Sequence, residues 1–188
     1  LCFAFHKLET FPGEILQLKK LKTLNLSNNR ITALPDNIGT LTYLEALILN
    51  KNKITSLPEN IGRLTRLRQL EVVHNEIAAL PKSLTKLSSL EILKIFFNNI
   101  QKLPEDIGEI HQLRELDAEL NCITALPASL TTLSNLQILN LWGNKIHKLP
   151  DDIGKLSRLS QLDASSTGIT ALPASLTTLS NLQILDIS

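Results

Sequence analysis

The stretch "LKTLNLSNNRITALPDNIGTLTY", residues 21–43, decides the fold. The next 23 residues, "LEALILNKNKITSLPENIGRLTR" (44–66), repeat its leucines, its asparagine and its Leu-Pro at the same positions. The pattern LxxLxLxxNxIxxLPxxIGxLxx continues through seven copies that fill residues 21–181. Residues 1–20 match the last twenty positions of an earlier copy, and residues 182–188 match the first seven of another. A fixed period of this length indicates stacked repeats, and positions 1–23 are counted here from Leu21.

Each copy reads as one turn of a coil. Apolar residues at positions 4 and 6 alternate with polar ones, which predicts a short, half-buried strand. One such strand cannot bury its apolar face alone, so neighbouring copies must stack into a parallel sheet with a continuous core. The asparagines at position 9 can each donate and accept hydrogen bonds to adjacent coils, forming a ladder. The predicted ladder consists of Asn29, Asn52, Asn75, Asn98, Asn121 and Asn144.

The second half of each copy reads as an outer turn. Leu-Pro at positions 14 and 15 holds the chain extended. Asn, Asp or Ser occupies position 17, as in Asn37 and Ser83, and these residue types are good N-caps. We therefore expect one helical or 3₁₀ turn on the outer face of every coil. Because this outer side is wider than the strand side, the stack should bend, with its strands on the concave surface.

Segments such as "LPDNIGTLTYL" (34–44) and "LPENIGRLTRL" (57–67) resemble the 23-residue class of leucine-rich repeats. They are similar to repeats of Ras-suppressor and Scribble-type intracellular scaffolds and of bacterial proteins, including secreted effectors. The resemblance covers the whole chain. It implies an α/β fold: a single solenoid domain over residues 1–188, with a parallel sheet on the concave face and short helical turns on the convex face. Because one scaffold serves diverse partners, the resemblance says little about function.

A 46-residue period lies over the first. From residue 58 the outer segments alternate, as in "PENIG" and "PKSLT", and "TALPASLTTLSNLQILN" (124–140) returns as "TALPASLTTLSNLQILD" (170–186). This alternation has two interpretations, an alternating surface with a function or a recent duplication of two coils. Two exceptions break the ladder, His6 near the N-terminus and Thr167. Threonine cannot replace both hydrogen-bonding groups of an amide, so we expect a weak coil around Thr167.

Composition and motifs argue against several classes of function. The net charge of +1 gives no general attraction to nucleic acid, and no apolar run is long enough to cross a membrane. Basic residues at position 10 of the first three coils are not continued. The four histidines lack zinc spacing, and no phosphate-binding glycine motif is present. The sequence therefore predicts no enzyme, no cofactor, no metal site and no nucleic-acid partner.

The cysteines bear on the compartment. Cys2 and Cys122 lie several coils apart, far beyond the about 7 Å between Cα atoms that a disulfide allows. Two free thiols predict the cytoplasm or another reducing compartment. The alternative is secretion by a bacterium into a host cell.

The residues that point outward from the strands, at positions 3, 5 and 7, carry the information about function. In the central coils bulky apolar side chains alternate there with charged ones. These predicted partner-binding residues are Phe96, Trp142, Val73, Ile92, Ile138, Glu71, Lys94, Glu115, Asp117 and Glu119. Exposed aromatic side chains are enriched among interface hot spots, and acidic neighbours suit a partner with apolar anchors and a Lys or Arg. Phe97, at position 8, is expected to cover the end of its strand.

The sequence thus predicts a protein-interaction module that binds a protein through its concave face. Two alternatives stay open: the targeting module of a bacterial effector whose enzymatic domain lies outside this chain, and a structural spacer. Both ends lie inside repeats, so we expect a part of a longer protein with apolar edges at its ends. The segment "LCFAF" (1–5) would then pack under a missing cap, or make end-to-end contact with another molecule.

Overall fold

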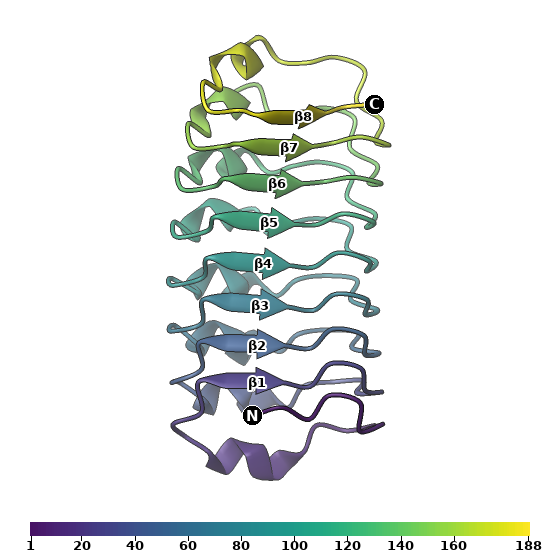
Figure 1. Ribbon diagram of the computed structural model, residues 1–188, viewed down its shortest axis with the longest axis vertical. Helices are drawn as coiled ribbons and strands as arrows, with labels where there is room; N and C mark the ends of the chain where they lie inside the picture. The colour runs from purple at the N-terminus through teal and green to yellow at the C-terminus, as the bar shows by residue number, and fades with distance from the viewer.

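The computed structural model describes all residues, 1–188, as one stack of coils (Figure 1). Eight short strands form one parallel sheet in sequence order, and the N- and C-termini lie at opposite ends of the stack. The strands are β1 Thr23–Asn25, β2 Ala46–Ile48, β3 Gln69–Glu71, β4 Ile92–Lys94, β5 Glu115–Asp117, β6 Ile138–Asn140, β7 Gln161–Asp163 and β8 Ile184–Asp186. Each residue of a strand pairs with the residue 23 positions further on in the next strand, as Leu24 does with Leu47. The predicted solenoid is therefore confirmed.

A single 3₁₀ turn on the outer face precedes each strand, so that every full coil carries one such turn, as the sequence predicts. The turns are η1 Gly13–Gln17, η2 Asp36–Thr40, η3 Glu59–Arg63, η4 Lys82–Lys86, η5 Ile107–Glu109, η6 Ala128–Thr132, η7 Ile153–Lys155 and η8 Ala174–Thr178. None of these helices is long and apolar enough to cross a bilayer.

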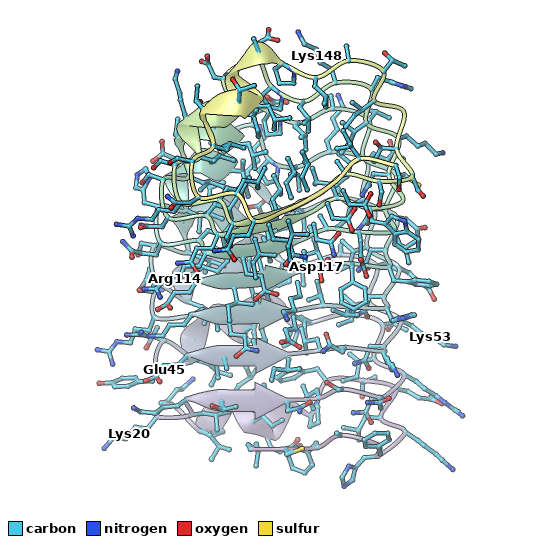
Figure 2. The ribbon with its side chains drawn as sticks, turned by 45° about the horizontal axis from the view of Figure 1, so that its top comes forward. Lys20, Glu45, Lys53, Arg114, Asp117 and Lys148 are labelled. Carbon is cyan, nitrogen blue, oxygen red and sulfur yellow. The ribbon has the colours of Figure 1, made fainter.

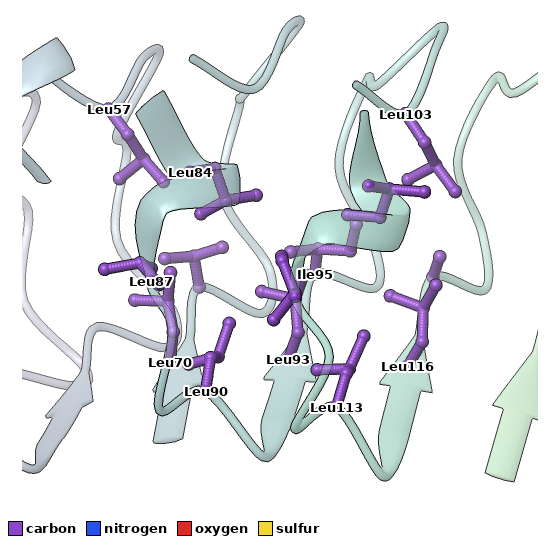
Figure 3. Packing of buried hydrophobic residues seen from close by; sticks show 14 of the residues in the cluster. Leu57, Leu70, Leu84, Leu87, Leu90, Leu93, Ile95, Leu103, Leu113 and Leu116 are labelled. Atoms are coloured by element: carbon purple, nitrogen blue, oxygen red, sulfur yellow. The ribbon is translucent and has the colours of Figure 1, made fainter. Parts of the chain in front are cut away.

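The core fills the space between the sheet and the outer turns. Leucine and isoleucine side chains from strands and turns meet there, as Leu93 and Leu84 do in Figure 3. Both have no exposed area. Because each coil packs on the coils before and after it, the core runs through the whole stack. The two end coils expose apolar side chains, such as Phe5 and Ile184, which confirms the expected apolar edges.

The asparagine ladder is present. Asn98 is typical: its Nδ2 donates to the carbonyl oxygens of Ile95 in its own coil and Val72 in the preceding coil, at 3.0 and 2.9 Å. Its Oδ1 accepts from the backbone N–H of Ile77 at 3.0 Å. The other five asparagines make the same three kinds of contact, except that Asn29 has its partners in the partial first coil.

Thr167 supports the ladder only in part. Its Oγ1 donates to the carbonyl oxygen of Ala164 at 2.7 Å, within its own coil. In the coil before it, the backbone N–H of Ile146 has no acceptor, although Ile146 has no exposed area. In the five full coils before that one, an asparagine supplies this acceptor. The expected weak coil thus has a structural cause, an unpaired buried N–H group.

The prediction that position 17 caps the outer turns is wrong. Six of the turns begin directly after the proline at position 15 or its equivalent. The turns η5 and η7 begin after Asp106 and Asp152 at position 17, but neither these nor the other turns have a side-chain cap hydrogen bond. Ser129 instead bonds to the preceding coil: its Oγ donates to the carbonyl oxygen of Glu105 and accepts from the N–H of Gly108. Ser175 makes the same two contacts with Asp151 and Gly154. A 3₁₀ turn leaves few unpaired N–H groups, so these two serines join coils rather than capping their own turns.

The 46-residue period has a packing consequence. Glycine at position 19 lets the next outer turn approach closely, because a methyl group on Gly62 or Gly108 would collide with the carbonyl oxygen of Ser83 or Ser129. Threonine occupies position 19 in η4 and η6, and after these two turns the next turn packs less closely. Two grooves result, of about 460 Å³ between η4 and η5 and about 600 Å³ between η6 and η7. Their lining residues correspond one to one at a spacing of 46.

Candidate functional site

The predicted partner-binding residues come together on the concave face, which is defined here by positions 3, 5 and 7 of the coils. Strand register aligns Ile92 with Glu115 and Lys94 with Asp117. It likewise aligns Glu115 with Ile138. Phe96, Glu119 and Trp142 follow β4, β5 and β6 at the same position of three successive coils. Figure 2 shows Asp117 over the sheet, whereas Glu45 and Lys53 project from its opposite edges.

The two aromatic residues of the face differ in exposure. Trp142 is 37% exposed, and Phe96 is half-buried. The ring of Phe96 meets His74 edge-on, with centroids 6.2 Å apart. One coil, carrying Glu119, separates Phe96 from Trp142, which places them about 10 Å apart along the sheet. The two aromatic residues therefore lie on either side of Glu119 on an open surface.

Val73 contradicts the expectation of an exposed residue, because its exposed fraction is only 6%. It is a short side chain between the longer Asn50 and Phe96, which occupy the same position of the neighbouring coils. Its backbone N–H donates to Oδ1 of Asn50 at 2.9 Å. Val73 therefore supports the face and offers little contact area. Ile92 and Ile138 are half-buried.

Most carboxylates of the face have partners within it. Glu115 pairs with Lys94 at 2.9 Å, and this contact raises the pKa of Lys94. Glu71 accepts from the side-chain amides of Asn50 and Gln69 at 2.6 and 2.7 Å. Glu119 accepts from Nδ2 of Asn140 at 2.8 Å.

Asp117 is the exception. Its only hydrogen bond is a long one, 3.4 Å, from the backbone N–H of Glu119. Burial and then the nearby charge of Glu119 raise the pKa of Asp117 to about 6, although Lys94 opposes the shift. The charged form of a half-buried carboxylate that has one long hydrogen bond is stabilised by any cation that approaches it.

Sequence reasoning missed two contributors. Phe97 is 48% exposed and so does not simply cover the strand end. It has a left-handed backbone, with φ of 56°, as have the other position-8 residues from Asn28 to Ser166. This conformation turns the side chain onto the rim of the face, beside Leu120. The signal was present in the sequence: glycine at position 8 of one coil, Gly143, where φ is 67°.

Asn140 is the second missed contributor. It binds Glu119 and also accepts from the backbone N–H of Trp142 at 3.3 Å. Asn140 therefore fixes two residues of the face at once. A side-chain oxygen at position 5 that accepts from position 7 recurs in other coils, as in Asn25 with Ser27. That two-residue spacing is typical of an Asx-turn and was the available signal.

Two descriptions of known protein families match the chain. The family described as "Leucine-rich repeat region" matches residues 6–143, and "Leucine Rich Repeat" matches residues 135–156. The chain belongs to the leucine-rich repeat family. No curated protein sequence matches it.

Solved leucine-rich repeat structures are similar over nearly the whole chain. A leucine-rich repeat protein of Leptospira interrogans is 26% identical with a TM-score of 0.78, covering 100% of this chain and 60% of its own. The plant peptide hormone receptor RGFR1, in complex with RGF2, is 27% identical with a TM-score of 0.85, covering 95% of this chain and 30% of its own. The Arabidopsis receptor kinase HAESA, in complex with the peptide hormone IDA and the co-receptor SERK1, is 27% identical with a TM-score of 0.83. That match covers 95% of this chain and 31% of HAESA.

Other features of this leucine-rich repeat chain offer no comparable site. No group of three or more His, Cys, Asp or Glu side chains could hold a metal ion. Cys2 and Cys122 are free. The two large grooves lie on the outer side, between Thr85 and η5 and between Thr131 and η7, and follow from the packing at position 19.

Proposed function

We propose that this leucine-rich repeat chain is a non-enzymatic module that binds a protein or peptide partner through its concave face. The observation that carries the proposal is the aromatic pair of exposed Trp142 and half-buried Phe96 on an open sheet face. Aromatic side chains supply much of the binding energy of protein interfaces. Two similar solved receptors, RGFR1 and HAESA, were determined with peptide hormones, which supports a peptide or protein as partner.

The test compares three forms of the chain as bait for capture from native lysates. The double variant Phe96→Ala/Trp142→Ala should lose the captured partner. Tyr43→Ala is the matched control, because Tyr43 is 42% exposed and lies outside the concave face, under the guanidinium of Arg66. This control should retain the partner. Both variants should melt within a few degrees of the parent chain.

Three results would count against this function. Equal capture by the parent and the double variant would show that the partner does not bind through the aromatic pair of the concave face. If no form of the chain captured anything, the alternative of a structural spacer would be favoured. A large fall in the melting temperature of the double variant, with capture intact, would assign the two rings to packing.

The location of the chain is a separate proposal. Two free cysteines support a reducing compartment, either the cytoplasm or, for a bacterial effector, the interior of a host cell. Imaging of the tagged natural protein in its own cells tests this. A location in an oxidising compartment would reject it.

A further inference from the structure

The charges of the concave face differ from those of the chain as a whole. The whole chain has a net charge of +1. On positions 3, 5 and 7, by contrast, six carboxylates accompany one ammonium group, that of Lys94. The carboxylates belong to Glu71, Glu115, Asp117, Glu119, Asp163 and Asp186. A surface with this imbalance attracts a basic partner and repels nucleic acid and acidic segments.

The acidic groups are not equally available to a partner. Lys94 already neutralises Glu115, and amide groups satisfy Glu71. Serine groups bond to Asp163 and Asp186 close to the C-terminal end. Asp117 has one long hydrogen bond and no ion pair within 4 Å. It is therefore the carboxylate with the most to gain from an added cation.

The position of Asp117 relates this carboxylate to the aromatic pair. Asp117 and Glu119 belong to the coil between those of Phe96 and Trp142. The two rings lie about 10 Å apart along the sheet, which three residues of extended chain would span. A single short segment can thus place an apolar side chain at each ring and a cationic one between them.

We propose that the concave face binds an extended basic peptide segment of a partner protein, with a Lys or Arg on Asp117 and Glu119 and apolar side chains against Phe96 and Trp142. This inference rests on the proposed function and specifies its partner. The charge complementarity of the face selects this occupant. Arg is the better fit, because its planar fork can bond to two carboxylates at once.

The experiment uses a random dodecapeptide display library on four immobilised baits. These are the parent chain, Phe96→Ala/Trp142→Ala, Asp117→Asn/Glu119→Gln, and the control Glu105→Gln/Asp106→Asn. The control removes two exposed carboxylates from the outer side of the stack. Circular dichroism and melting temperatures of all four baits confirm that each is folded.

The parent and the control should enrich peptides in which a Lys or Arg has an apolar residue two to four positions away. Asp117→Asn/Glu119→Gln should lose the basic preference and bind a selected peptide about tenfold more weakly. Peptides that need Phe96 and Trp142 but carry no basic residue would overturn this inference and leave the proposed function standing. No enrichment, or the same peptides on the aromatic double variant, would overturn both.

Discussion

The imidazole ring of His74 stacks on the phenyl ring of Phe97, with centroids 3.9 Å apart and planes inclined by 25°. Both residues occupy position 8 of neighbouring coils, and both have a left-handed backbone, with φ of 53° and 56°. The stack therefore bridges two coils at the rim of the concave face. It gives Phe97 a structural contact while leaving nearly half of its surface exposed.

The first prediction concerns this stack. In a double-mutant cycle of His74→Ala and Phe97→Ala, the two substitutions should be coupled by about 0.5–1 kcal/mol in free energy of unfolding, because each removes the same ring contact. Urea denaturation measures it. Lys51→Ala with Phe97→Ala is the control, since one coil separates these residues, and should be additive. Additivity in both cycles would show that the stack contributes nothing.

The second prediction concerns the incomplete ladder. Thr167→Asn should stabilise the chain by about 1 kcal/mol, because Oδ1 of the new side chain can accept from the unpaired N–H of Ile146. Urea denaturation measures the gain, and amide hydrogen exchange at Ile146 should slow. Thr167→Ser is the control and should give neither effect. Unchanged exchange at Ile146 in the asparagine variant would count against this account.

The third prediction concerns an intact rung of the ladder. Asn98→Ala should cost at least about 2 kcal/mol, because it leaves the carbonyl oxygens of Ile95 and Val72 and the N–H of Ile77 without this partner. Asn99→Ala, at an exposed neighbouring position, should change stability by less than about 0.5 kcal/mol. Equal losses in thermal or urea unfolding would refute the ladder's role.

The fourth prediction concerns the close outer turns. Gly108→Ala should destabilise the chain by about 2 kcal/mol or more, because its methyl group would meet the backbone of Ser129. Gly13→Ala is the matched control: Gly13 also lies in an outer turn, but nothing lies within 4 Å of the added methyl group. It should be neutral or slightly stabilising. Similar melting temperatures for the two variants would contradict the packing at position 19.

The fifth prediction concerns pH. The pKa of Asp117 rises from 3.8 to about 6 on folding, so the folded chain binds the extra proton between these values. Stability of the parent chain should therefore fall as pH rises through this window. The groups that face Asp117 are Lys94 on β4, Glu115 and Glu119 on its own coil, and the neutral Asn140 on β6.

Asp117→Asn removes that charge. It should stabilise the chain by on the order of 1 kcal/mol at pH 7, after allowance for solvent screening, and by almost nothing at pH 3.5. Urea unfolding at both pH values measures this, and Asp36→Asn, an exposed residue of η2, serves as control. A stabilisation that is equal at both pH values would contradict the role of the charge.

Much of the fold could be predicted from the sequence, because a repeat supplies its own alignment. The buried leucines, the asparagine ladder and the outer turns follow from positions that recur every 23 residues. The set of outward-pointing residues could be predicted as well, since side chains alternate along a strand. The break in the ladder at Thr167 followed as well, because its cause is a single missing amide.

Contacts between coils decided the rest. Val73 is covered although the pattern predicted an exposed residue, because exposure depends on the sizes of neighbours 23 residues away. Phe97, which was expected to cover the end of its strand, is 48% exposed, because the left-handed turn at position 8 directs its side chain to the rim. The raised pKa of Asp117 likewise arises from burial and from charges on its own and adjacent coils. The sequence by itself determined which residues each coil buries, since apolar periodicity is local. Only the tertiary structure decided how far each outward side chain reaches solvent, because that depends on the coils stacked on either side.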